Sequence, residues 1–65
     1  MRIVVNGNET ETSAKTVRDL LVELGFRDKP VIVEQNKQAL LKQELAEAAV
    51  AENDRIEVIT LAAGG

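Results

Sequence analysis

TVRDLLVELGF, residues 16–26, carries the strongest pattern in this sequence and decides which fold the chain can adopt. Apolar residues recur there at the spacing i, i+3, i+4 and i+7, as Val17, Leu20, Leu21 and Leu24. This spacing places all four on one face of an α-helix, and the charged residues of the stretch fall on the other face. The pattern therefore predicts an amphipathic helix whose leucines belong to a core.

The sequence also marks both ends of this helix. Thr16 stands at the N-cap position, and Asp19, three residues later, completes an imperfect capping box. Gly25 stands just past the end, where a positive φ is common, and Phe26 follows where an apolar side chain can pack back on the helix. The helix is therefore expected to begin after Thr16 and to end before Gly25.

The segment before the helix predicts a β-hairpin. Residues 2–5 are rich in β-branched side chains, and Asn6-Gly7 is a strong hairpin signal because both residues tolerate the positive φ of a type I′ turn. The polar run NETET, residues 8–12, supplies a second strand. Its charges are typical of an exposed edge strand, where they discourage unwanted pairing.

The segment after the helix predicts two strands, a second short helix and a last strand. Pro30 disfavours helix at the preceding residue, so residues 31–33 should begin a strand, and Asn36-Lys37 predicts a tight turn into a short strand over 38–40. Residues 42–50, KQELAEAAV, favour helix by composition and by an apolar face. Asn53 can adopt the left-handed conformation of a turn, and residues 55–60 alternate as a strand.

One amphipathic helix and a sheet with one apolar face make a two-layer α+β domain, with the helix lying across the sheet. We expect the last strand to pair with the first, in parallel and in the centre of a mixed sheet, which is the β-grasp arrangement. The expected organisation is one domain, residues 1–60, and a flexible tail, residues 61–65. The expected core consists of Ile3, Val5, Val17, Leu20, Leu21, Leu24, Val31, Val33, Leu45, Ile56 and Val58.

The composition excludes several classes of function. The 65 residues include no cysteine and no histidine, which removes the common nucleophile pairs and the soft metal ligands, so we expect neither an independent enzyme nor a metal site. The formal net charge is −3, basic residues are scattered and Phe26 is the only aromatic residue, so nucleic acid is a poor partner. No apolar run approaches the roughly 20 residues of a membrane span. We expect a cytoplasmic protein that is monomeric when free.

The sequence ends on two glycines, and this tail is the candidate reactive site. Because glycine has no Cβ, Gly64 and Gly65 can enter a narrow channel and present the Gly65 carboxylate to a reagent in a second protein, and Ala62 and Ala63 are small enough to follow. An enzyme that holds ATP can convert this carboxylate into an acyl-adenylate, which a thiol, persulfide or amine then attacks. The alternative is an inert, frayed chain end.

Several motifs together make the chain resemble the ubiquitin-like sulfur carriers, most closely the ThiS family of thiamine biosynthesis. Each motif is common by itself, but their combination with a terminal diglycine is typical of the family. They span the whole chain: residues 3–7 (IVVNG), Thr16-Val17, 19–21 (DLL), Leu24-Gly25, 31–36 (VIVEQN), 54–58 (DRIEV) and Gly64-Gly65.

The resemblance implies a ubiquitin-like β-grasp fold and a carrier cycle. In the family, a ThiF-like enzyme uses ATP to adenylate the C-terminal glycine, sulfur relayed from a cysteine desulfurase converts it to a thiocarboxylate, and a ThiG-like thiazole synthase receives the sulfur. By direct match, Gly65 would carry the adenylate and then the sulfur, and Gly64 would leave the approach unobstructed. The chain itself would bind no cofactor.

Three other functions stay open at this point. A MoaD-like carrier of molybdopterin synthesis shares the fold and the ending, but it is usually longer and often has an aromatic residue and a proline near the tail. A ubiquitin-like protein modifier uses the same activation but forms an isopeptide bond with a lysine. A plain interaction module would use neither chemistry.

The departures from the family pattern concern turns and packing. Lys37 and Asn53 stand where glycine is common, Leu45 where a bulky aromatic residue is common, and Leu41-Lys42 where proline or arginine is common. None of them touches the chemistry of the tail.

The strand alternation also predicts a docking surface. If the core residues of the sheet face the helix, then Val4, Ile32, Ile59 and Leu61 project from the opposite face. An apolar group beside the tail favours a protein interface, on which the activating enzyme would dock, although scattered surface aliphatic residues are normal. Glu57 and Glu34 would pair with basic residues of the partner and assist the encounter.

Overall fold

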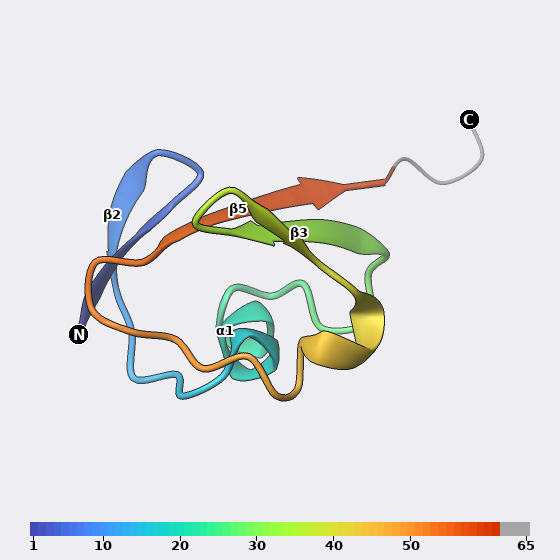
Figure 1. Ribbon diagram of the computed structural model, residues 1–65, viewed down its shortest axis with the longest axis horizontal. Coiled ribbons are helices and arrows are strands. Elements are labelled where there is room, and N and C mark those ends of the chain that lie inside the picture. The colour runs from blue at the N-terminus through green and yellow to red at the C-terminus, as the bar shows by residue number, and fades with distance from the viewer. Residues whose placement is uncertain (62–65) are drawn as a thin grey trace.

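The computed structural model describes residues 1–61 and contains a five-stranded mixed sheet with one α-helix against one of its faces (Figure 1). The predicted α+β β-grasp fold is confirmed, with the strand order β2-β1-β5-β3-β4. The elements are β1 (Arg2–Val5), β2 (Asn8–Glu11), α1 (Val17–Glu23), β3 (Val31–Gln35), β4 (Gln38–Leu40), the 3-10 helix η1 (Lys42–Glu44) and β5 (Arg55–Thr60).

The last strand occupies the centre of the sheet, as predicted. It runs parallel to β1, with Val5 opposite Ile56, and antiparallel to β3, with Val33 opposite Val58. Because β5 has a strand on each side, its backbone groups are paired where an edge strand would leave them open. The chain therefore reaches its last described residue directly from the central strand of the sheet.

The predicted tight turns adopt the backbone conformation that their residues favour. Asn6 and Gly7 have φ values of 49° and 83°, as a type I′ turn requires. Asn36 and Lys37 repeat this pattern at 52° and 72°, and Asn53 has a φ of 71°. Lys37 thus holds a left-handed conformation that costs a residue with a Cβ about 1–2 kcal/mol.

Both predicted caps of α1 are present. The Thr16 hydroxyl accepts a hydrogen bond from the Asp19 amide at 3.1 Å. At the other end, Gly25 has a φ of 86°, its amide donates to the Val22 carbonyl, and the Phe26 amide donates to the Leu21 carbonyl at 2.8 Å. These two bonds form a Schellman motif, so the helix ends where the sequence predicts.

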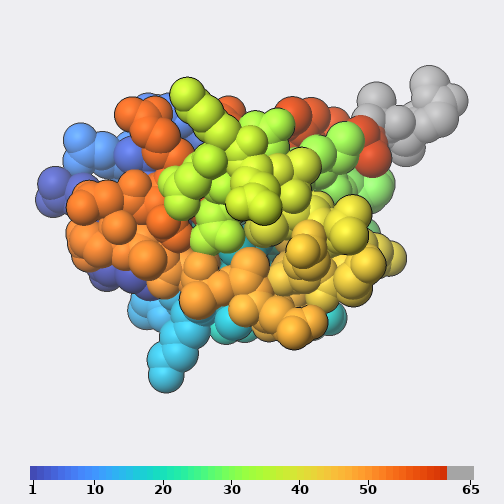
Figure 2. Space-filling model, viewed as in Figure 1, coloured from blue at the N-terminus to red at the C-terminus, as the bar shows by residue number. Residues whose placement is uncertain are grey.

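The predicted second helix over 42–50 is wrong in its extent, because only Lys42–Glu44 form a short 3-10 turn. The carbonyls of Leu45 and Ala48 accept from the Arg18 and Val17 amides at 2.9 Å each, which are free N–H groups at the start of α1. Ala49 forms an isolated bridge with Thr16. The segment thus caps α1 with carbonyls that a continuous helix would use internally, and Figure 2 shows it covering α1 on the face in view.

The core lies between α1 and the sheet. Of the eleven predicted core residues, Leu24, Val31 and Leu45 are only partly buried and pack against the others, which are buried. The core also includes Ala14 and Val50, which were not predicted. Ile3, Val17, Leu20 and Ile56 have no exposed surface.

Thr12 corrects the prediction of an exposed strand over residues 8–12. β2 ends at Glu11, and Thr12 is 6% exposed. Its hydroxyl donates to Glu23 Oε1 at 2.6 Å and accepts from the Ala14 amide at 3.0 Å. A buried hydroxyl needs such partners, and these ones join the end of the hairpin to α1.

Replacing Leu20 by alanine should lower the free energy of unfolding by about 2–5 kcal/mol, because a fully buried leucine leaves a cavity when it is truncated. Val22→Ala is the matched control: Val22 lies on the same helix but is 53% exposed, so its loss should cost under about 0.5 kcal/mol. Urea unfolding followed by circular dichroism measures both. Equal midpoints for the two variants would contradict the orientation of the helix.

Candidate functional site

β5 carries the chain to the base of the predicted tail. The Leu61 amide donates to the Pro30 carbonyl at 3.0 Å, so backbone pairing with the β3 side continues one residue beyond the strand. Leu61 is 47% exposed. The residues predicted to react or to give access, Ala62, Ala63, Gly64 and Gly65, lie outside the described residues.

The start of β5 is held by a polar cluster around Asp54. The Asp54 carboxylate accepts from the Ala51 amide at 2.8 Å, from Gln35 Nε2 at 2.9 Å and from Asn36 Nδ2 at 3.0 Å. Asn36 also exchanges two bonds with Arg55: its amide donates to the Arg55 carbonyl, and its side-chain oxygen accepts from the Arg55 amide. The turn between β3 and β4 thus fixes the residue at which β5 begins.

Burial of Asp54 raises its pKa, but the hydrogen bonds from Asn36, the Ala51 amide and Gln35 act in the opposite direction. Their combined effect is larger, so the pKa of Asp54 lies below its ordinary value. Hydrogen bonds to the charged form are the cause, since each donor stabilises the carboxylate and not the protonated acid.

In the middle of β5, the side chain of Asn6 makes two hydrogen bonds of the kind that the backbone of a neighbouring strand would make. Asn6 leaves β1 at the hairpin turn, and its side-chain oxygen accepts from the Val58 amide at 2.8 Å while its Nδ2 donates to the Val58 carbonyl at 3.3 Å. A backbone in the same place would make the same two bonds. The hairpin signal at Asn6-Gly7 therefore also fixes the register of β5.

The face of the sheet that points away from α1 contains the predicted docking residues and is named here the outer face. Along β5, Ile56 and Val58 are buried, whereas Glu57 and Ile59 are exposed. Ile59 lies directly opposite Ile32 of β3, and the two are 52% and 45% exposed. Together with Leu61 at the end of the strand, they form an apolar group at the base of the tail.

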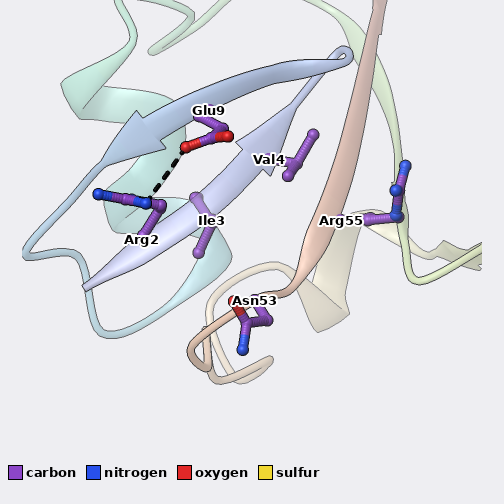
Figure 3. A pocket seen from close by; sticks show the side chains of 6 residues that line it. All are labelled: Arg2, Ile3, Val4, Glu9, Asn53 and Arg55. Carbon is purple, nitrogen blue, oxygen red and sulfur yellow. Dashed lines mark ion pairs between the residues drawn. The ribbon is translucent and has the colours of Figure 1, made fainter.

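Val4 lies on the same face but apart from this group. It is partly buried and faces Arg55 in the register, whereas Ile59 lies two outward positions farther along β5, at roughly 13–14 Å. Val4 borders a hollow of about 340 Å³ between β1 and the start of β5. In Figure 3, Arg2 and Glu9 lie on one side of Val4 and Arg55 on the other, and the remaining lining residues are Ile3 and Asn53.

Two charged features of the outer face depend on the register, which the sequence does not reveal. Glu57 lies directly opposite Glu34, so two like charges face one another across β3 and β5. At the β1 end, Arg2 pairs with Glu9 at 3.3 Å and with Glu11 at 3.8 Å. Alternation alone could place Glu34 and Glu57 on the outer face, but only the pairing brings them together.

Within residues 1–61, no group of three or more acidic residues lies close enough to hold a metal ion. In the same part of the chain, no helix is sufficiently long and apolar to span a membrane.

Comparisons with known proteins find sulfur carriers named ThiS and a thiazole synthase. The chain is 33% identical over 61 residues to the sulfur carrier protein ThiS of Thermus thermophilus, covering 94% of this chain and 95% of that protein. It is 39% identical over 66 residues to a thiazole synthase of Paramagnetospirillum magneticum, but it spans only 20% of that protein's length while all of this chain is matched. The crystal structure of the thiamine biosynthesis protein ThiS from Geobacter metallireducens superimposes with a TM-score of 0.83 at 26% identity, covering all of both chains.

The fold and the strand that leads to a terminal diglycine define a β-grasp domain of the ubiquitin-like class. The model of the ThiS family matches residues 3–65, which includes the last residue of the sequence. The chain belongs to the ThiS family.

Asp54→Asn should destabilise the domain in a pH-dependent way. Because the pKa of Asp54 in the folded protein lies below its ordinary value of 3.8, the carboxylate contributes stability above that value, and the contribution disappears as the pH falls through the folded pKa. At pH 7 the variant should lose on the order of 1 kcal/mol, since the carboxylate is partly exposed and screened. The difference from the wild type should shrink towards pH 2.5. Urea midpoints across this range test the expectation, with Asp28→Asn as an exposed control, and a difference independent of pH would contradict it.

Proposed function

We propose that this chain is a sulfur carrier of thiamine biosynthesis, in which the Gly65 carboxyl group is adenylated and then converted to a thiocarboxylate. The observation that carries the proposal is the family match, which continues through Gly64 and Gly65 to the end of the sequence. The anchored base of the tail supports it, because the Leu61 amide is bonded to the Pro30 carbonyl, four residues before Gly65.

The chemistry requires an activated carboxyl group. A free carboxylate is a poor electrophile, so its oxygen must first attack the α-phosphate of ATP, which releases pyrophosphate and leaves an acyl-adenylate on Gly65. A persulfide then attacks the carbonyl carbon, AMP leaves with the electron pair of the broken C–O bond, and an acyl disulfide forms. A thiol of the partner enzymes attacks the S–S bond of this acyl disulfide on the donor's sulfur, which supplies the two electrons and releases the thiocarboxylate; with hydrosulfide as donor, the thiocarboxylate forms directly on loss of a proton. ATP is thus a substrate of the activating enzyme and not a bound cofactor of this chain.

The composition of the tail suits delivery into a second protein. Four extended residues span at most about 14 Å, so the carboxyl group of Gly65 reaches no farther than that beyond Leu61. Gly64, Ala63 and Ala62 carry small side chains or none, and a narrow channel can therefore admit them. The partner must bring its reactive centre within this distance of the folded body.

Three partners complete the proposed cycle. A ThiF-like enzyme adenylates the tail, a cysteine desulfurase supplies the sulfur by relay, and a ThiG-like thiazole synthase consumes it. The similarity to part of a thiazole synthase supports the last partner, because a ThiS-like segment there belongs to the same protein. The carrier is then a co-substrate of other enzymes, and its need for ATP fits a cytoplasmic location. The family match favours this pathway over the molybdopterin alternative.

Deleting Gly65 should abolish thiocarboxylate formation while the melting temperature stays unchanged, because the reactive carbon is the terminal carboxyl of that residue. The assay is reconstitution with the ThiF-like enzyme, ATP and a sulfide source, followed by intact mass. The wild type should gain the mass that corresponds to the replacement of one oxygen by sulfur. A chain extended by one alanine is a second test variant, and it should also form no thiocarboxylate because its terminal carboxyl group is no longer that of Gly65.

Full thiocarboxylate formation by the shortened chain would contradict the assignment of Gly65 as the residue that carries the sulfur. A ladder of conjugates on a gel in the same reaction would instead indicate a protein modifier.

We also propose that the activating enzyme docks on the apolar group formed by Ile32, Ile59 and Leu61. Ile59→Asp should weaken binding by at least about 1–2 kcal/mol, as expected when a charge enters the centre of an apolar contact. Val22→Asp is the matched control, since Val22 is 53% exposed and Ile59 52%, but Val22 lies on α1. Calorimetric titration of the two folded variants with the enzyme measures the difference. Equal affinities would place the docking surface elsewhere.

A further inference from the structure

The outer face presents its side chains in a fixed order along β5. Outward positions recur about every 6.5–7 Å, because successive side chains of a strand point to opposite faces. Arg55 comes first, Glu57 second and Ile59 third, and Leu61 follows at the base of the tail. Along β5, the outward side chains are therefore first basic, then acidic and then apolar, and the tail follows.

Residues of the neighbouring strands lie beside the basic, the acidic and the apolar position of β5, which are called here the basic, acidic and apolar steps. Arg55 lies beside Val4 and the 340 Å³ hollow, which gives the basic end a concave surface. Glu57 is paired with Glu34, and Ile59 with Ile32. The acidic and apolar steps are thus each two side chains wide.

The domain itself makes little use of these charges. Among residues 1–61, no ion pair within 4.0 Å involves Arg55, Glu57 or Glu34, whereas Arg2 pairs with Glu9 and Glu11. Two like charges directly opposite one another in a sheet are destabilising. A basic side chain from outside the chain removes this repulsion, so the acidic step is complementary to a cationic group of a partner.

We propose that the charge order along β5 orients the activating enzyme on the carrier. The partner surface carries an acidic side chain for the Arg55 end, a basic side chain for Glu57 and Glu34, and an apolar platform for Ile59 and Ile32. A partner turned by 180° brings its apolar platform onto Arg55 and its acidic group onto Ile59, which buries unpaired charge. The order therefore selects the one direction in which the tail enters the ATP site.

This inference rests on the proposed function, because it names the recognition that precedes adenylation. Orientation matters here because the tail has a short reach, at most about 14 Å beyond Leu61. A partner that binds the same face in the opposite direction places its reactive centre at the Arg55 end, where the carboxyl group of Gly65 does not arrive.

The experiment compares Arg55→Glu, Glu57→Arg and the double swap R55E/E57R with the wild type. The double swap keeps the net charge and the composition but reverses the order of charges. The control is a second swap, K42E/E47K, at two exposed residues of the segment that covers α1. For each folded variant, calorimetry with the ThiF-like enzyme gives Kd, and pyrophosphate release at saturating carrier gives the rate of adenylation.

Each single variant should raise Kd at least fivefold, and the double swap should bind no better than the weaker single variant. Its adenylation rate should fall at least tenfold, while the K42E/E47K control stays within twofold of the wild type in both measurements. The melting temperature of Glu57→Arg should not fall, because the variant replaces a like-charge pair with an opposite-charge pair.

Recovery of wild-type affinity in the double swap would overturn the inference, since net charge alone would then account for binding. Single variants with unchanged Kd, or a control swap as damaging as the test swap, would overturn it as well. Failure of the proposed function looks different: in that case the wild type itself would release no pyrophosphate with the enzyme and ATP.

Discussion

Pairing of β5 between β1 and β3 is the constraint on which the rest of the molecule depends. The strand is bonded at its start by Asn36, in its middle by Asn6 and just beyond its end by the carbonyl of Pro30. Each of these contacts comes from a different turn or strand end. A slip by one residue would break all three and turn Ile56 and Val58 towards water, so the register is strongly specified.

Because β5 is fixed between β1 and β3, the folded body and the proposed reactive end have separate roles. The body contributes a strand that continues to Leu61, whose amide donates to the Pro30 carbonyl at the base of the tail. Its outer face supplies apolar and charged groups beside that point. In the proposed cycle, the terminal carboxyl group and the partner that holds ATP carry out the chemistry. A domain without histidine or cysteine would take part in sulfur transfer in this cycle by contributing a carboxyl group.

Local signals predicted the elements whose stability is local. The caps at Thr16 and Gly25 and the turn at Asn6-Gly7 need only neighbouring residues, and all three form as predicted. The helix predicted over residues 42–50 is wrong because carbonyls of this segment accept hydrogen bonds from the amides at the start of α1. Helix propensity does not include such a tertiary contact. The burial of Thr12 has the same origin, since its partner Glu23 lies on α1. For the site, alternation predicted the outer face, but the separation of Val4 from Ile59 and the opposition of Glu34 and Glu57 follow from register alone.

The most direct test of the account uses a chain labelled with ¹³C at the Gly65 carbonyl carbon. Its resonance and the amide signals of β5 are recorded in one sample during incubation with the activating enzyme, ATP and a sulfur donor, and after the carrier is released. The account predicts that the labelled carbon moves to a thiocarboxylate position while the amides of Val58 and Leu61 keep their shifts and their protection from exchange. Sulfur incorporation with an unchanged Gly65 resonance, or loss of protection across β5 in the released carrier, would contradict it.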